Sequence, residues 1–119
     1  ELSYQILGAS FRVFNEFGWG APEKQYQLAL AKEFEIREIP FKREVYIPIN
    51  YNSAKIGKYF ADFVVEGKIL LELKVVRKLG YEHTRQLLSY LKNSNMKLGI
   101  ILYFSPDGVK YRRVLNSAV

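Results

Sequence analysis

The spacing of apolar residues along the chain switches between a helical period and an alternating one, and it predicts eight elements. Apolar side chains that recur every three or four positions predict helices over residues 2–17, 23–38 and 82–93. Alternating or continuous apolar runs predict strands over residues 45–51, 58–65, 68–76, 98–104 and 109–115. The order ααβββαββ, without a linker, indicates a single domain over residues 1–119. We expect an α/β or α+β fold with helices flanking one central mixed β-sheet.

Turn residues refine this prediction. Pro48 argues that the first strand lies at an edge of the sheet or carries a bulge. The segment 66–68 is typical of a tight hairpin turn with Gly67 in the left-handed conformation. If this turn has three residues, its flanking residues pair with each other and Asp62 faces Glu72. A two-residue turn would shift the pairing by one position and remove that contact.

The apolar positions of the predicted helices also indicate which aromatic side chains form the core. We expect four phenylalanines to be buried there: Phe11, Phe14, Phe17 and Phe34. On the last predicted strand, Arg112 and Arg113 fit an exposed, charged edge of the sheet.

Composition narrows the chemistry that the chain can perform. Apolar residues make up 49% and charged residues 25% of the 119 positions, which is typical of a globular protein. The chain has no cysteine and one histidine, His83, so Cys-type zinc sites, thiol nucleophiles and multi-histidine metal centres are excluded. Any metal must therefore bind carboxylate and carbonyl oxygens, which favours Mg²⁺ or Mn²⁺.

Charge is unevenly distributed along the chain. Residues 1–59 hold 8 Lys/Arg against 7 Asp/Glu, whereas residues 60–119 hold 10 against 5, so most of the net charge of +6 lies in the second half. This excess fits an anionic partner such as nucleic acid, and it fits a solvated basic surface equally well. No apolar run is long enough for a membrane span and no leader sequence is visible, so we expect a cytoplasmic protein without membrane contact.

Three charged residues occur on the two most apolar of the predicted strands, which should therefore lie centrally in the sheet. Asp62 lies on one strand, and Glu72 and Lys74 share one face of the next. Charges on interior strands are costly unless they are paired, and two opposed carboxylates call for a cation. Either Lys74 or a bound metal would supply it. The alternative is a Glu-Lys pair on a half-exposed strand, with Asp62 at a bend.

The spacing of these three residues resembles a known signature. Asp62, nine residues, and then Glu72-x-Lys74 is similar to the motif of the PD-(D/E)xK nuclease superfamily. The chain departs from the motif at its first element, because Ala61 stands where the proline would precede the aspartate. A second Glu-x-Lys triplet, at 66–68, coincides with the predicted turn and is set aside.

Two further segments extend the resemblance over nearly the whole chain. The segment 20–26 matches G-x-x-E-x-x-Y, the pattern of the GxxExxY family within that superfamily. Gln86 and Tyr90 form a Q-x-x-x-Y element that resembles one in recombination-type exonucleases, and their spacing puts them on one helical face. The resemblance therefore implies a restriction-endonuclease-like core.

The resemblance also implies a role for each matching residue. It implies that the metal ligands are Asp62, Glu72, the Leu73 carbonyl and, from the second helix, Glu23. Lys74 would activate water and stabilise charge on the phosphate. The supporting or substrate-binding residues would be Gln86, Tyr90 and Tyr26, although Tyr26 fits a buried core position equally well.

From the residues and the resemblance together, we expect a Mg²⁺- or Mn²⁺-dependent nuclease that hydrolyses phosphodiester bonds of nucleic acid, with DNA rather than RNA as the expected substrate. One alternative is a non-catalytic nucleic-acid-binding module that keeps the nuclease fold. Another is a partner-binding subunit whose activity needs a second protein or a homo-oligomer.

Overall fold

The computed structural model describes all 119 residues and contains the eight predicted elements in the predicted order. The helices are α1 (Leu2–Phe17), α2 (Glu23–Ile36) and α3 (Glu82–Ser94). The strands are β1 (Phe41–Tyr51), β2 (Ala54–Val65), β3 (Ile69–Val75), β4 (Leu98–Ser105) and β5 (Gly108–Leu115). The predicted α+β architecture is thus confirmed. None of the helices combines the length and the apolar character needed to cross a membrane.

The five strands form one mixed sheet in the order β1-β2-β3-β4-β5. Only β3 and β4 are parallel, and α3 connects them, as parallel neighbours require a crossover. Pro48 lies on β1, an edge strand, as predicted. The turn at 66–68 pairs Val65 with Ile69, which confirms the three-residue loop. Gly67 has φ 65°, the left-handed conformation that glycine adopts without steric cost.

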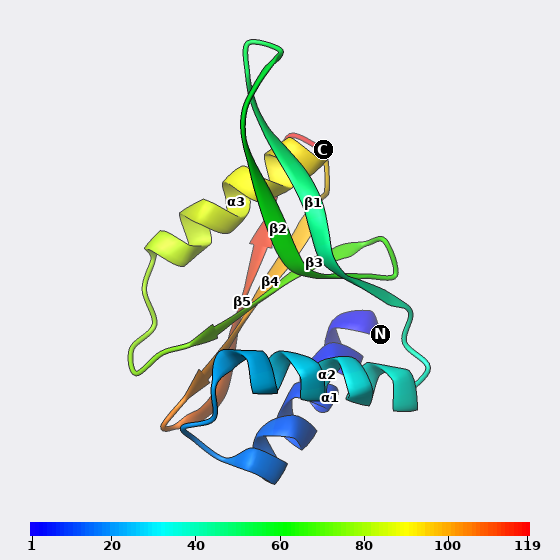
Figure 1. Ribbon diagram of the computed structural model, residues 1–119, viewed down its shortest axis with the longest axis vertical. Helices are drawn as coiled ribbons and strands as arrows, with labels where there is room; N and C mark the ends of the chain where they lie inside the picture. The colour runs from blue at the N-terminus through cyan, green and yellow to red at the C-terminus, as the bar shows by residue number, and fades with distance from the viewer.

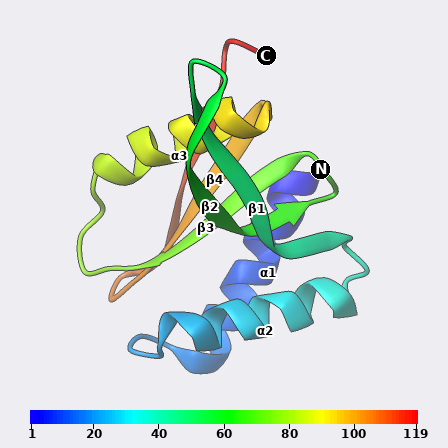
Figure 2. The same cartoon turned by 45° about the horizontal axis from the view of Figure 1, so that its top comes forward.

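Helices cover both faces of the sheet, α1 and α2 on one face and α3 on the other (Figures 1 and 2). The larger core lies under α1 and α2 and the smaller one under α3. The helix α3 packs closely because β4 has Gly99 at the contact, where a Cβ atom would lie 2.8 Å from a methyl group of Leu87.

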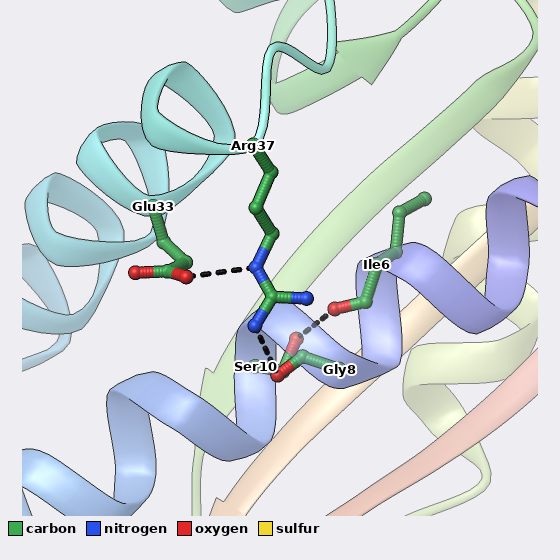
Figure 3. Close-up of polar contacts among 5 residues, drawn as sticks. All are labelled: Ile6, Gly8, Ser10, Glu33 and Arg37. Atoms are coloured by element: carbon green, nitrogen blue, oxygen red, sulfur yellow. Dashed lines mark hydrogen bonds and ion pairs between the residues drawn. The ribbon is translucent and has the colours of Figure 1, made fainter.

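Polar contacts join the two helices of the larger layer at one end (Figure 3). Arg37, which follows α2, donates to Glu33 at 2.7 Å and to the Gly8 carbonyl of α1 at 3.4 Å. Within α1, the Ser10 hydroxyl donates to the Ile6 carbonyl at 2.8 Å, so this buried polar group is satisfied. The Arg37 contacts thus connect the C-terminal end of α2 to α1.

The β1–β2 hairpin changes sides partway along its length. Phe63 belongs to the core under α1 and α2, whereas Ala61, two residues earlier, belongs to the core under α3. Regular alternation would place both on the same face. The strand pairing skips Glu44 and Asp62, and Glu44 has φ 52°, so the backbone is locally distorted there. Asp62 therefore lies where the hairpin switches faces.

Two expectations about the fold were wrong. The hairpin is longer than predicted, because Asn52 and Ser53 both adopt positive φ and close a two-residue turn between strands of 11 and 12 residues. Of the four phenylalanines expected in the core, Phe34 is buried and Phe14 is half-buried, but Phe11 and Phe17 are exposed. Only one side of α1 meets the sheet, and these two lie outside it.

Candidate active site where β2 and β3 separate

The backbone ladder between β2 and β3 ends after the pair Phe63–Leu71, and two carboxylates continue it. Asp62 Oδ2 accepts a hydrogen bond from the Leu73 N–H at 2.8 Å. Glu72 Oε2 accepts one from the Asp62 N–H at 3.1 Å. Each acid thus bonds the backbone of the opposite strand where a carbonyl would ordinarily do so. The two acids lie side by side, as the register predicted from the turn requires.

A tyrosine pair connects Glu72 to α3. The Tyr59 hydroxyl donates a short hydrogen bond to Glu72 Oε1. The ring of Tyr59 stacks on that of Tyr90 in α3, with ring centroids 3.6 Å apart and planes 12° from parallel. Protein donors bind both oxygens of Glu72. The residue is only 4% exposed, so the carboxyl group has little contact with water. Tyr90 itself makes no hydrogen bond to either acid and supports Glu72 by stacking on Tyr59.

Tyr59 was not among the predicted residues. Strict alternation along β2 puts residues 59 and 62 on opposite faces, so the pattern separated Tyr59 from Asp62. The face switch at Asp62 is what brings both next to Glu72. An aromatic residue three positions before a strand acid was the available signal, but it is too common to single out.

Lys74 and Glu23 complete the cluster. The positive charge of Lys74 lowers the pKa of Glu23, Asp62 and Glu72, although Lys74 forms no ion pair with any of them. Glu23 is the first residue of α2, and Gln27 donates to its carboxylate at 3.2 Å. The cluster therefore combines one helix terminus with two neighbouring strands.

Burial keeps the three carboxyl groups from ionising freely. It is the main cause that raises the pKa of Glu72 to about 7, and the charge of Asp62 adds to it. Burial likewise raises the pKa of Asp62, against the Leu73 N–H, Lys74 and Arg43, which lower it. The pKa of Glu23 is raised by burial and then by Asp62. Two cations, Lys74 and Arg43, therefore act on this cluster, and the pKa values of its three carboxyl groups are still raised, so a bound metal ion would stabilise their charged forms.

Two of the predicted supporting residues, Tyr26 and Gln86, make no hydrogen bond to the acid cluster. The Tyr26 hydroxyl donates to the Gly18 carbonyl and accepts from the Ala21 N–H, and its ring stacks on Phe104. Tyr26 is therefore a buried residue that holds the turn before α2. Gln86 is exposed on α3, one turn before Tyr90.

The donor set suits a hard divalent cation, although it is not gathered around one point. Its groups are carboxylates, and the backbone of Leu73 faces the same gap, because the amide and carbonyl of one strand residue point to the same neighbouring strand. No group of three or more potential ligands converges in the structure. The exposed Glu23 side chain would have to turn inward to complete such a group.

A family model described as the PD-(D/E)XK nuclease superfamily matches residues 1–114. The chain belongs to this superfamily. PD-(D/E)XK nucleases generally use divalent metal ions, which agrees with the oxygen-only donor set of the cluster. No curated protein sequence matches the chain.

Two solved structures share the fold of this PD-(D/E)XK chain. The crystal structure of SSO0001 has a TM-score of 0.60 and 24% identity, covering 80% of this chain and 52% of the other. The alkaline exonuclease LHK-Exo from Laribacter hongkongensis has a TM-score of 0.57 and 11% identity, covering 98% and 83%. The chain thus spans about half the length of SSO0001. The expected restriction-endonuclease-like fold is confirmed.

Proposed function

We propose that this PD-(D/E)XK chain is a metal-dependent nuclease that hydrolyses DNA at the cluster of Asp62, Glu72 and Lys74. The supporting observation is that Asp62 and Glu72 lie side by side where β2 and β3 separate, each bonded to a backbone N–H of the opposite strand. Neighbouring carboxylates that are partly buried destabilise the fold unless a cation compensates their charge, so their presence here favours a bound cation.

The ligands that we propose for Mg²⁺ or Mn²⁺ are Asp62, Glu72, the Leu73 carbonyl and Glu23. A divalent ion bound there supplies Lewis acidity at the phosphate and lowers the pKa of a water molecule. Asp62 and Glu72 are held by backbone donors, so their orientation requires little reorganisation. Glu23 is the exposed member of the set, and its side chain would have to turn inward to join the other ligands.

The other residues act on position and charge. Lys74 places a positive charge where negative charge grows on the phosphate during hydrolysis. Tyr59 fixes one oxygen of Glu72, and Tyr90 fixes the Tyr59 ring from α3. We propose that Gln86, exposed one helical turn before Tyr90, contacts the substrate.

We further propose that the chain belongs to the GxxExxY family, because the structure suggests a reason for the spacing of its motif. Tyr26 is turned into the core and bonds the Gly18 carbonyl, which holds the turn that leads into α2. Glu23, one helical turn earlier, has an exposed side chain, and the charge of Asp62 raises its pKa. Tyr26 thus fixes the position at which α2 begins, and Glu23 is the first residue of that helix.

Calorimetric titration with Mn²⁺, followed by cleavage assays on labelled DNA and RNA, tests this function. We expect wild-type protein to bind the ion and to cleave DNA, and Asp62→Asn to lose both. The matched control is Asp107→Asn, which changes an exposed aspartate in the β4–β5 turn and should alter neither. Metal binding that survives in Asp62→Asn would contradict the assignment of the site.

One observation favours the non-catalytic alternative. Protein donors already hold Asp62 and Glu72, and no set of three ligands converges. A module that binds nucleic acid without cleaving it would bind in the absence of metal, with strong salt dependence. Such binding without cleavage under any metal condition would support it. The homo-oligomer and the cytoplasmic location stay predictions.

A further inference from the structure

The β1–β2 hairpin projects beyond the rest of the sheet, past the end of α3 (Figures 1 and 2). One face of it packs on α3, through Val45, Ile47 and Ala61. The opposite face is exposed and has Tyr46 paired with Phe60 and Pro48 paired with Lys58. We call this exposed face, made of Tyr46, Lys55, Lys58 and Phe60, the hairpin platform.

The platform alternates aromatic rings and ammonium groups. The Tyr46 and Phe60 rings lie 5.7 Å apart, and they are 44% and 50% exposed. Lys55 Nζ lies 5.0 Å from the centre of the Tyr46 ring, and Lys58 Nζ lies 5.9 Å from that of Phe60. Each ring therefore has a cation beside it and retains accessible surface for a further planar group.

The projecting part of the hairpin carries charge of one sign only. Residues 45–61 contain Lys55 and Lys58 but neither aspartate nor glutamate. The ion pairs of the structure involve other lysines, such as Lys24 with Glu44 and Lys32 with Glu35. Two lysines without an acidic partner, next to exposed rings, complement a ligand that combines anionic groups with flat aromatic ones.

The platform leads to the acid cluster. Phe60 is two residues from Asp62, about 7 Å along the strand at the usual rise of a β-strand. Tyr46 and Phe60 lie on the face opposite α3, which is the face that α2 covers further along, where Glu23 begins that helix. A polymer lying along the platform would therefore arrive at the side of the cluster where Glu23 lies.

We propose that the hairpin platform binds a single-stranded segment of nucleic acid, with bases stacked on Tyr46 and Phe60 and phosphates neutralised by Lys55 and Lys58. This inference rests on the proposed function, since it supplies the substrate contact of that same site. A single strand is the fitting ligand because its bases are free to stack on side chains, whereas those of a duplex stack on one another.

Fluorescence anisotropy with labelled dT₁₂, U₁₂ and a 12-base-pair duplex, in EDTA to prevent cleavage, tests the platform. We expect Tyr46→Ala/Phe60→Ala to weaken single-strand binding about tenfold or more. Tyr46→Leu/Phe60→Leu should lose a similar amount, because leucine keeps apolar area but has no π face. In Lys55→Ala/Lys58→Ala, the slope of log K against log salt should fall in magnitude by about 1.4, or about 0.7 for each phosphate.

Two matched controls lie away from the platform. Tyr111→Ala changes an exposed tyrosine on β5, the opposite edge of the sheet, and Lys68→Ala changes an exposed lysine in the β2–β3 turn. Both should bind like wild type. Equal losses in these controls, or wild-type affinity in the platform variants, would overturn the proposal. Stronger binding of the duplex than of the single strands would also overturn it. The same holds if sedimentation shows that wild type is a dimer and that the platform variants are monomers, because the lost binding would then follow from dissociation.

Hydrolysis of a small chromogenic phosphodiester with Mn²⁺ separates this proposal from the proposed function. If wild type hydrolyses the diester and the platform variants bind single strands normally, the platform is wrong and the nuclease assignment stands. If wild type hydrolyses neither the diester nor DNA but the platform variants lose single-strand binding, the platform stands and the nuclease assignment is wrong. We expect the platform variants to hydrolyse the diester at the wild-type rate.

Discussion

The chain contains the triplet Glu-x-Lys twice, six residues apart, and the two copies differ in almost every physical respect. Glu66 and Lys68 are exposed in the β2–β3 turn, where Gly67 allows the chain to reverse. Glu72 and Lys74 lie on β3, the central strand, and Glu72 is almost completely buried. The same three-letter pattern therefore serves as a solvated turn in one place and as part of an acid cluster in the other.

The difference shows that neighbours, and not the triplet itself, make the chemistry. Only the second copy has Asp62 facing its glutamate and a tyrosine hydroxyl bound to it. Burial there raises the pKa of Glu72 to about 7. Because the two copies are matched in composition, each substitution at the second has a natural control at the first.

The largest contrast is expected for the lysines. Lys74→Ala should reduce DNA cleavage by about 10²–10³-fold, the usual loss when one group that stabilises transition-state charge is removed. Lys68→Ala should leave the rate unchanged. Single-turnover cleavage at saturating enzyme measures both, and Mn²⁺ titration should show that Lys74→Ala still binds the ion. Equal rates in the two variants would make Lys74 a structural charge.

The glutamates should differ next, in metal affinity. Glu72→Gln should weaken Mn²⁺ binding about 10–100-fold, because a neutral amide replaces a proposed charged ligand. Glu66→Gln should bind the ion like wild type. Calorimetry on both proteins at one pH gives the ratio directly, and identical affinities would exclude Glu72 as a ligand.

Glu72→Gln and Glu66→Gln should also differ in how their free energy of unfolding depends on pH. The folded pKa of Glu72, near 7, lies above its ordinary value of 4.5, so the folded protein binds more protons between these values. Wild-type stability therefore falls as pH rises through that window. Without metal, Glu72→Gln should be more stable than wild type by roughly 1–2 kcal/mol at pH 8 and should lose this advantage near pH 4.5.

Urea unfolding at several pH values measures this difference, and Glu66→Gln is again the control. Its offset from wild type should stay the same across the window. An offset of Glu72→Gln that does not change with pH would show that Glu72 ionises as readily in the folded protein as in the unfolded chain.

The smallest effect is expected at Tyr59. Its hydrogen bond lowers the pKa of Glu72, so Tyr59→Phe should raise that pKa and move the acidic limb of the cleavage profile upward by less than about one pH unit. Tyr111→Phe, on an exposed strand position, should leave the profile in place. A downward shift in Tyr59→Phe would contradict the assigned hydrogen bond.

Much of the fold and part of the site could be predicted from the sequence because they depend on local patterns. Periodicity identified all eight elements, and the turn at 66–68 narrowed the pairing to two registers, of which the one that places Asp62 opposite Glu72 is found. Pro48 correctly indicated an edge strand, because the reason is a missing donor in the residue itself.

The remainder depends on where the backbone departs from regularity. The contact of Tyr59 with Glu72 could not be predicted, because it needs the face switch that the left-handed Glu44 marks on the neighbouring strand. The length of the hairpin was missed because its turn uses asparagine and serine without glycine. Phe11 was misplaced since periodicity defines an apolar side of α1 without saying how wide the buried strip is.

The stacking of Tyr59 on Tyr90 has a consequence for how the protein folds during synthesis. Asp62, Glu72 and Lys74 all lie in one hairpin, so a growing chain could bring them together early. Tyr90 and the parallel partner β4 come from residues 82–105, which leave the ribosome later. The acids therefore lack their rigid support until the crossover has closed. Enough of the chain to complete the fold must be made before this cluster acquires its buried, preorganised form.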